Sequence, residues 1–145
     1  MPRTKSRLIP SMFATALLVA LLASCGSDLL NLDQQWSLQT VRDTTLPYTV
    51  PNASHDIVIN SAVASLHSDN TYSTKFTGTS DGSAGTVGTD VGEWSITSSV
   101  FTFHSTTLGR DYIAALVGNT FRGSVPGEII SSSDPFFDMV FSRGP

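Results

Sequence analysis

The chain has 145 residues, of which 8 are Lys or Arg and 12 are Asp or Glu, so its formal net charge is −4. The basic residues beyond position 40 are scattered singly, which argues against binding nucleic acid or anionic lipid headgroups through a basic patch. The single cysteine excludes an internal disulfide.

The first 25 residues have the three-part layout of a secretory signal. Three basic residues make the start positive, an apolar stretch covers residues 12–23, and Cys25 follows small residues. The sequence Leu22-Ala23-Ser24-Cys25 resembles the lipobox of bacterial lipoproteins, in which the signal is cleaved before the cysteine and the thiol is acylated. This resemblance implies a signal peptide at 1–24 and a Cys25 that carries fatty acyl chains such as palmitate.

Two other interpretations of this segment are an uncleaved anchor helix and an ordinary secretory signal beside an incidental free cysteine. The apolar stretch of about 12 residues is shorter than the roughly 20 that a transmembrane helix needs. An unpaired thiol in an oxidising compartment calls for another purpose, and lipidation supplies one. We therefore expect a lipid anchor in the bacterial cell envelope. Several acyl chains on one residue would hold the protein stably on the membrane, because each buried methylene contributes about 0.8 kcal/mol to membrane binding. Gly26, by resemblance to the enterobacterial sorting rule, favours the outer membrane, with the protein facing the periplasm or the cell surface.

Cleavage before Cys25 would leave five Lys and Arg against twelve Asp and Glu, a net charge of −7. The mature chain would have 121 residues, a length that suits one domain able to bury a core without disulfides. We expect a lipidated tether at 25–35 and one domain at 36–145. Within the tether, Leu29, Leu30 and Leu32 form a small apolar cluster, which we expect to pack over one open end of the domain, with partner binding as the alternative.

From Trp36 onward the chain shows short strand-like stretches separated by turn residues, and helical periodicity is nowhere sustained. The expected strands are 36–42, 56–67, 71–79, 92–97, 100–104, 111–117, 120–123, 128–131 and 136–142. Tight connections between consecutive strands predict hairpins. A meander of eight or nine strands hides its edges best by closing on itself, so the predicted fold class is all-β, an antiparallel up-and-down barrel.

Alternating side chains give each expected strand an apolar face. Tyr72 and Phe76 lie on one face of their strand, for example, and Lys75 lies on the other. The strand at 111–117 is apolar on both faces, which predicts that a flanking loop or the leucine segment covers its outside.

Several short motifs occur along the chain in a particular order: Trp36-Ser37-Leu38, Asp69-Asn70-Thr71-Tyr72, Gly92-Glu93-Trp94-Ser95-Ile96, Val100-Phe101-Thr102-Phe103 and Tyr112-Ile113-Ala114-Ala115-Leu116. In this order and spacing they resemble the lipocalin-like domains of many bacterial lipoproteins. The chain departs from the lipocalin pattern at Gln34, where a glycine is usual, and it is shorter than a full lipocalin. The resemblance implies an antiparallel barrel whose interior could hold a small apolar molecule.

Four aromatic residues are the candidates for the barrel interior: Phe76, Trp94, Phe103 and Tyr112. They could contact a small hydrophobic ligand, or they could simply pack the core. An eight-stranded barrel is just wide enough to be filled by side chains or to enclose one small ligand, so the sequence leaves both interpretations open.

The stretch 78–92 is rich in glycine and is expected to form a long, flexible hairpin connection. Asp81 and Asp90 could in principle ligate calcium, but their spacing matches no calcium-binding motif, and one loop supplies too few oxygens. No Gly-Lys-Ser/Thr ending marks a phosphate-binding loop either. We expect no metal site and no cofactor.

Catalytic motifs are likewise not evident in the sequence. His55, His67 and His104 lie far apart without a zinc-binding spacing, and no helix is expected that could form the strand-to-helix turn of a serine nucleophile elbow. We expect surface histidines and a protein that is not an enzyme.

Two functional hypotheses remain. The first is a lipid-anchored module that binds a small hydrophobic molecule, which would need a cavity of roughly 300 Å³ or more. The second is a non-catalytic envelope interaction or scaffold protein with a solid barrel core, which would expose an apolar patch or a free sheet edge. The protein partner is not identifiable from the sequence.

Overall fold

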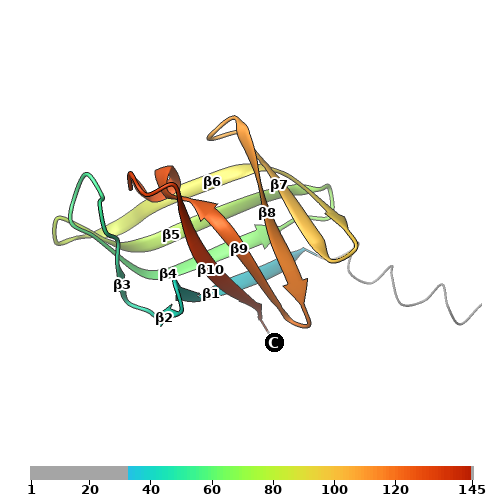
Figure 1. Ribbon diagram of the computed structural model, residues 1–145, viewed down its shortest axis with the longest axis horizontal. Helices are drawn as coiled ribbons and strands as arrows, with labels where there is room; N and C mark the ends of the chain where they lie inside the picture. Colours follow the sequence, from blue (N-terminus) through green and yellow to red (C-terminus); the bar gives the residue numbers. More distant parts are fainter. Residues whose placement is uncertain (1–32, 145) are drawn as a thin grey trace, which may run out of the picture. The chain divides into compact units, whose positions relative to one another are not determined.

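The computed structural model describes residues 33–144, which form β-strands and one short 3₁₀ helix (Figure 1). In chain order the elements are β1 (Gln34–Val41), β2 (Thr44–Thr45), β3 (Tyr48–Thr49), β4 (Ile57–Leu66), β5 (Thr71–Ser80), β6 (Ser83–Thr97), β7 (Val100–Ser105), β8 (Arg110–Val117), β9 (Thr120–Pro126), η1 (Gly127–Ile130) and β10 (Phe136–Arg143). Within this part of the chain, no helix is long and apolar enough to span a bilayer.

Eight of these strands close into a barrel. From β4 to β10 each strand pairs antiparallel with the next, and β1 pairs with both β10 and β4. The two short strands lie outside this ring, with β2 beside β1 and β3 beside β4. The closure leaves the eight long strands without a free edge, and it confirms the predicted antiparallel up-and-down barrel.

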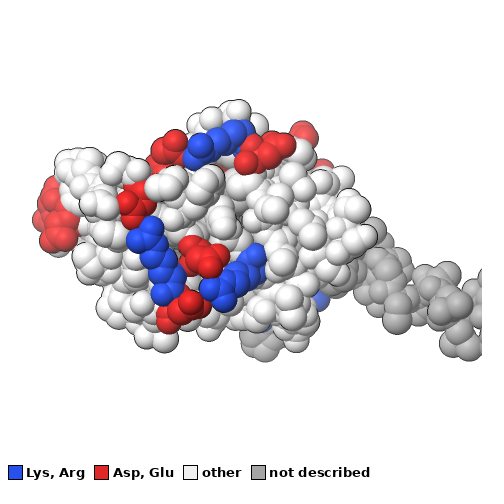
Figure 2. Space-filling view, viewed as in Figure 1, with Lys and Arg blue, Asp and Glu red and all other residues white. Residues whose placement is uncertain are grey.

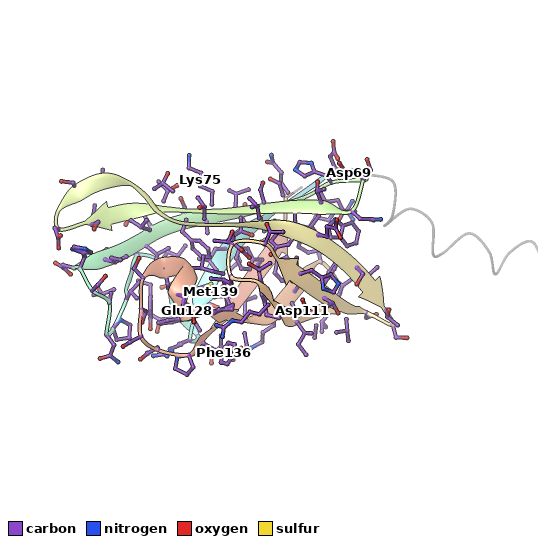
Figure 3. The ribbon with its side chains drawn as sticks, turned by 90° about the horizontal axis from the view of Figure 1, so that it is seen from above. Asp69, Lys75, Asp111, Glu128, Phe136 and Met139 are labelled. Carbon is purple, nitrogen blue, oxygen red and sulfur yellow. The ribbon has the colours of Figure 1, made fainter. Side chains whose placement is uncertain are left out.

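The barrel interior is filled by the apolar faces that the alternation predicts. In β1, Trp36 and Leu38 are buried while Ser37 between them is exposed. Figure 3 shows the same contrast for Met139, which lies inside the barrel, and Lys75, which points outward. The aromatic rings interlock, with Phe121 5.1 Å from Trp36 between ring centroids. Such contacts make the interior a packed core rather than an open channel.

The barrel has two unlike ends. One end, here called the entry end, holds the start of β1 and the turns β4–β5, β6–β7 and β8–β9. At the opposite end, η1 places Ile129 and Ile130 in the core. The helix stops at Ser131, which adopts the left-handed conformation. Its two buried isoleucines close this end of the barrel.

The expectation of a long loop at 78–92 is wrong. Strands β5 and β6 continue through this stretch and meet in a turn at Asp81 and Gly82. Some of the glycines allow close approaches between strands: a Cβ on Gly78 would clash with the carbonyl oxygen of Val58 in β4. Glycine within a strand often marks such an approach of another backbone. A glycine such as Gly78 therefore indicates a close contact between strands and not a flexible loop.

The expected strand at 128–131 is also wrong, because this segment forms η1 and the turn after it. The preceding strand, β9, is longer than expected and ends at Pro126. The short strands β2 and β3 were not predicted, since two residues are too few to show alternation. The barrel domain begins with β1 at Gln34, slightly before the expected start.

Candidate functional site

A buried carboxylate forms the centre of the most polar part of the barrel interior. Asp90 in β6 is 0% exposed. The hydroxyls of Tyr72 in β5 and Tyr112 in β8 donate hydrogen bonds to its Oδ2, at 2.6 and 2.7 Å. The Ser105 hydroxyl in β7 donates to Oδ1 at 2.5 Å. Three donors from three strands thus replace the water that this carboxylate would lose on burial.

The backbone around Asp90 brings these donors close. Tyr72 and Gly92 lie opposite each other in the β5–β6 pair, and a Cβ on Gly92 would lie 3.1 Å from the Tyr72 ring. The missing side chain at Gly92 therefore leaves room for the ring near Asp90. Ser105 is held in turn by the β7–β8 connection, because its hydroxyl accepts a hydrogen bond from the Leu108 amide at 3.0 Å.

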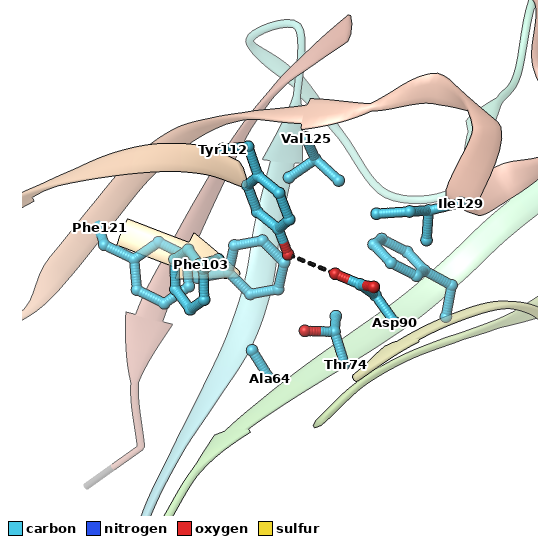
Figure 4. Close-up of a pocket in the computed structure, with 10 residues that line it drawn as sticks. Ala64, Thr74, Asp90, Phe103, Tyr112, Phe121, Val125 and Ile129 are labelled. Carbon is cyan, nitrogen blue, oxygen red and sulfur yellow. Dashed lines mark hydrogen bonds between the residues drawn. The ribbon is translucent and has the colours of Figure 1, made fainter. Parts of the chain in front are cut away.

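A small cavity lies beside this cluster (Figure 4). The volume open to the centre of a water molecule is about 10 Å³, which is room for about one water. The lining residues are Ala64, Thr74, Phe76, Asp90, Phe103, Tyr112, Phe121, Val125, Ile129 and Phe141. The wall is therefore mainly apolar, with Asp90, Thr74 and Tyr112 as its polar members.

Three of the four predicted interior aromatics line this cavity: Phe76, Phe103 and Tyr112. Trp94 is also buried, but it is not among the lining residues. Its indole nitrogen donates to the carbonyl oxygen of His67 in the β4–β5 turn, at 3.1 Å. Trp94 therefore packs the entry end. The fifth predicted site residue, Cys25, lies outside the described residues.

Asp90 is the member of the site that the sequence interpretation missed, because it was assigned to a flexible loop. The alternation offered a signal. Counting back in twos from the inward-facing Trp94 reaches Gly92 and then Asp90, which places the carboxylate on the interior face.

Burial and the neighbouring carboxylate raise the pKa of both tyrosines in the cluster. For Tyr72, desolvation raises the pKa most and the hydrogen bond to Asp90 adds to it. For Tyr112, desolvation is again the main cause, and the negative charge of Asp90 follows. Both phenols therefore remain protonated in the folded protein above the usual tyrosine pKa of about 10.

This shift predicts that alkaline pH destabilises the folded protein. The unfolded chain releases the two phenolic protons near pH 10 while the folded chain keeps them. The tyrosine contribution to stability is therefore complete below about pH 10 and falls as the pH rises further. Urea unfolding at about pH 8 and about pH 11 should show the loss, and phenolate absorbance of these two residues should appear together with unfolding. Phenolate absorbance from Tyr72 and Tyr112 in a fully folded protein would contradict the prediction, with Tyr72→Phe and Tyr112→Phe assigning the signal.

The three histidines lie on the surface, each beside an aspartate. Nδ1 of His55 lies 2.9 Å from Asp81 and Nδ1 of His104 lies 2.9 Å from Asp111, while His67 lies 3.5 Å from Asp33. Each pair is solvent-exposed. Over residues 33–144, no three His, Cys, Asp or Glu side chains gather closely enough to hold a metal ion.

The chemistry that this site supports is hydrogen bonding within the protein. The hydroxyls of Tyr72, Tyr112 and Ser105 donate to the Asp90 carboxylate and the adjoining space admits about one water, so the arrangement stabilises the barrel interior. Comparisons of the chain with family models, with curated proteins and with solved structures found no match.

Proposed function

We propose that the protein is a lipid-anchored lipoprotein of the bacterial cell envelope whose solid barrel serves as a non-catalytic interaction or scaffold module. The observation that carries this proposal is the filled interior. A cavity of about 10 Å³ is far smaller than the roughly 300 Å³ that a small-molecule pocket needs. The outer surface is then the part of the domain that is available to a partner.

The buried polar cluster supports the same proposal. Because Asp90 accepts hydrogen bonds from Tyr72, Tyr112 and Ser105, a ligand that displaced these side chains would leave the carboxylate without its donors. An unsatisfied buried carboxylate is costly. The interior is thus better suited to holding the barrel together than to exchanging a hydrophobic ligand, which was the other hypothesis.

The anchor is tested by comparing wild type with Cys25→Ser in a bacterial host. The wild-type protein should float with membranes, and its intact mass should include acyl chains on residue 25, since several chains on one residue give stable anchoring. Cys25→Ser should lose both properties. The matched control is Ser24→Ala, which keeps a small residue before the cysteine and should behave as wild type. A wild-type protein without acyl mass would overturn the anchor.

The solid interior is tested by native mass spectrometry of the purified lipidated protein before and after organic extraction. The expected result is one mass, equal to the polypeptide plus its covalent acyl chains. A further mass that extraction removes would reveal a bound small molecule. That result would replace the scaffold proposal with the carrier hypothesis.

A further inference from the structure

Two adjacent hairpins at the entry end of the barrel have no charged side chains over long stretches. Residues 94–103 and 112–121 contain no Asp, Glu, Lys or Arg. The first stretch covers the end of β6 and the start of β7, and the second covers most of β8 and the start of β9. Because β7 and β8 pair directly, the two stretches form one continuous uncharged surface.

This surface exposes large apolar side chains. Val117 is 72% exposed, Ile113 is 59% exposed and Val100 is 39% exposed. Ala115, opposite Val100 in the register, is exposed as well. We call these four residues the apolar rim. Within the described part of the chain no loop covers the outer face of β8, contrary to the sequence expectation of a flanking loop, and the leucine segment lies outside the described residues.

On the outer faces of β7 and β8 themselves, the charged side chains lie away from the entry end, whereas Arg122 of β9 borders the rim opposite Ala115. His104 and Asp111 pair further along β7 and β8, and Arg110 pairs with Glu128 of η1. Figure 2 shows basic side chains beside acidic ones in the centre and at the top of the view, whereas the surface over the β8–β9 turn is white. A mature chain of net charge −7 would be repelled by anionic headgroups, and the four residues of the apolar rim add no charge to that repulsion.

The covalent chain leads to this same end. Asp33 lies at the entry end, where its carboxylate accepts a hydrogen bond from the Ser68 amide in the β4–β5 turn at 3.2 Å. Asp33 lies eight positions after Cys25, so this segment spans at most about 28 Å when fully extended. A ten-residue strand such as β4 is itself about 33 Å long. An anchor at Cys25 would therefore keep the entry end close to the bilayer, and the opposite end could reach the bilayer only with the tether stretched along the barrel.

We propose that the apolar rim is a membrane-contact surface, which rests on the phospholipid bilayer with Val117 among the headgroups. This inference depends on the proposed lipid anchor at Cys25. The inference adds an orientation to the proposed anchor: η1 and the β5–β6 turn point away from the membrane. Shallow burial of exposed apolar side chains in the interface favours this arrangement, and the absence of charge on residues 112–121 removes the desolvation cost of placing them there.

The test uses a thiol-reactive, environment-sensitive fluorophore on the full lipidated protein. Acylated Cys25 has no free thiol, so Val117→Cys carries the only labelling site. The matched control is Ser83→Cys, an exposed residue next to the β5–β6 turn at the opposite end. Both proteins are reconstituted into phosphatidylcholine vesicles in which some lipids carry a nitroxide near the headgroup. The label at 117 should lose at least about half of its emission, because interfacial burial reaches about 5–10 Å into the boundary, and the label at 83 should keep its emission.

The outcomes separate this inference from the anchor. If the protein carries its acyl chains and floats with vesicles, but the label at 117 is not quenched, the rim contact is wrong and the anchor stands. Equal quenching at 117 and 83 also overturns the orientation. Shielding of the label at 117 that grows with protein concentration and is independent of lipid nitroxide would assign the rim to a contact between copies. Labelling of wild type at Cys25 would show a free thiol and would overturn the proposed anchor itself.

Discussion

Replacing Phe103 by alanine should lower the free energy of unfolding by about 3–5 kcal/mol, the range for removing a buried phenylalanine. Phe103 is 3% exposed, and its ring centroid lies 5.0 Å from that of Tyr72 and 5.2 Å from that of Tyr112. Few neighbours can collapse into the space, because the β-barrel wall holds them in place. The midpoint of urea unfolding measures the effect.

The same variant tests whether the solid interior excludes ligands. Phe103 lines the cavity, so its removal should enlarge a space for one water into one that admits a small apolar molecule such as benzene. Phe103→Ala should gain stability from benzene, and wild type should not. The control is Phe136→Ala in β10, whose side chain is 48% exposed, and which should cost less than about 1 kcal/mol. Equal stability of the two variants would contradict the packing described for Phe103.

Replacing Asp90 by asparagine should cost about 2–4 kcal/mol, because one carboxylate oxygen is exchanged for an amide group that cannot accept hydrogen bonds. If the amide nitrogen replaces Oδ1, the Ser105 hydroxyl faces this donor. If it replaces Oδ2, the two tyrosine hydroxyls face it. The control is Asp56→Asn, since the Asp56 side chain is exposed at the start of β4. Chemical denaturation of both variants measures the difference. An Asp90→Asn protein as stable as the control would show that the three hydroxyl hydrogen bonds contribute little.

A double-mutant cycle tests whether Tyr112 and Asp90 stabilise the protein through a direct contact with each other. Tyr112→Phe removes one of the two donors to Oδ2 and should cost about 1.5–3 kcal/mol as a hydrogen bond to a charged group. Combined with Asp90→Asn, it should cost less than the sum of the single changes, because the two side chains share one interaction. Strict additivity would contradict a direct contact between Tyr112 and Asp90.

Side-chain alternation predicted most of the barrel correctly. It identified β4, β5, β7 and β10 almost to their ends, since each has a buried face and a solvent face, whereas β8 was located by the turn residues on either side of it. It failed where this contrast is absent or where the chain bends. The glycine-rich start of β6 has no alternating side chains to read, and η1 follows Pro126 with a short isoleucine pair that resembles a strand.

The candidate site was only partly accessible to the same reasoning. Period-two alternation placed Phe76, Phe103 and Tyr112 inside, and they line one cavity. It did not reveal Asp90, because a carboxylate in a glycine-rich stretch is typical of a solvated turn. The partners of Asp90 belong to other strands, and no local pattern in β6 indicates them.

The sequence by itself determined the strand faces, the up-and-down order and the motif at Cys25, since these depend on residues that are neighbours in the chain. Only the tertiary structure decided that Tyr72, Ser105 and Tyr112 meet at one carboxylate and that the interior has room for about one water. It also decided that the four residues of the apolar rim lie together on one exposed surface. The physical reason is that alternation specifies which way a side chain points, whereas the volume left inside depends on the register, the closure of β1 on β4 and the packing of all the inward side chains together.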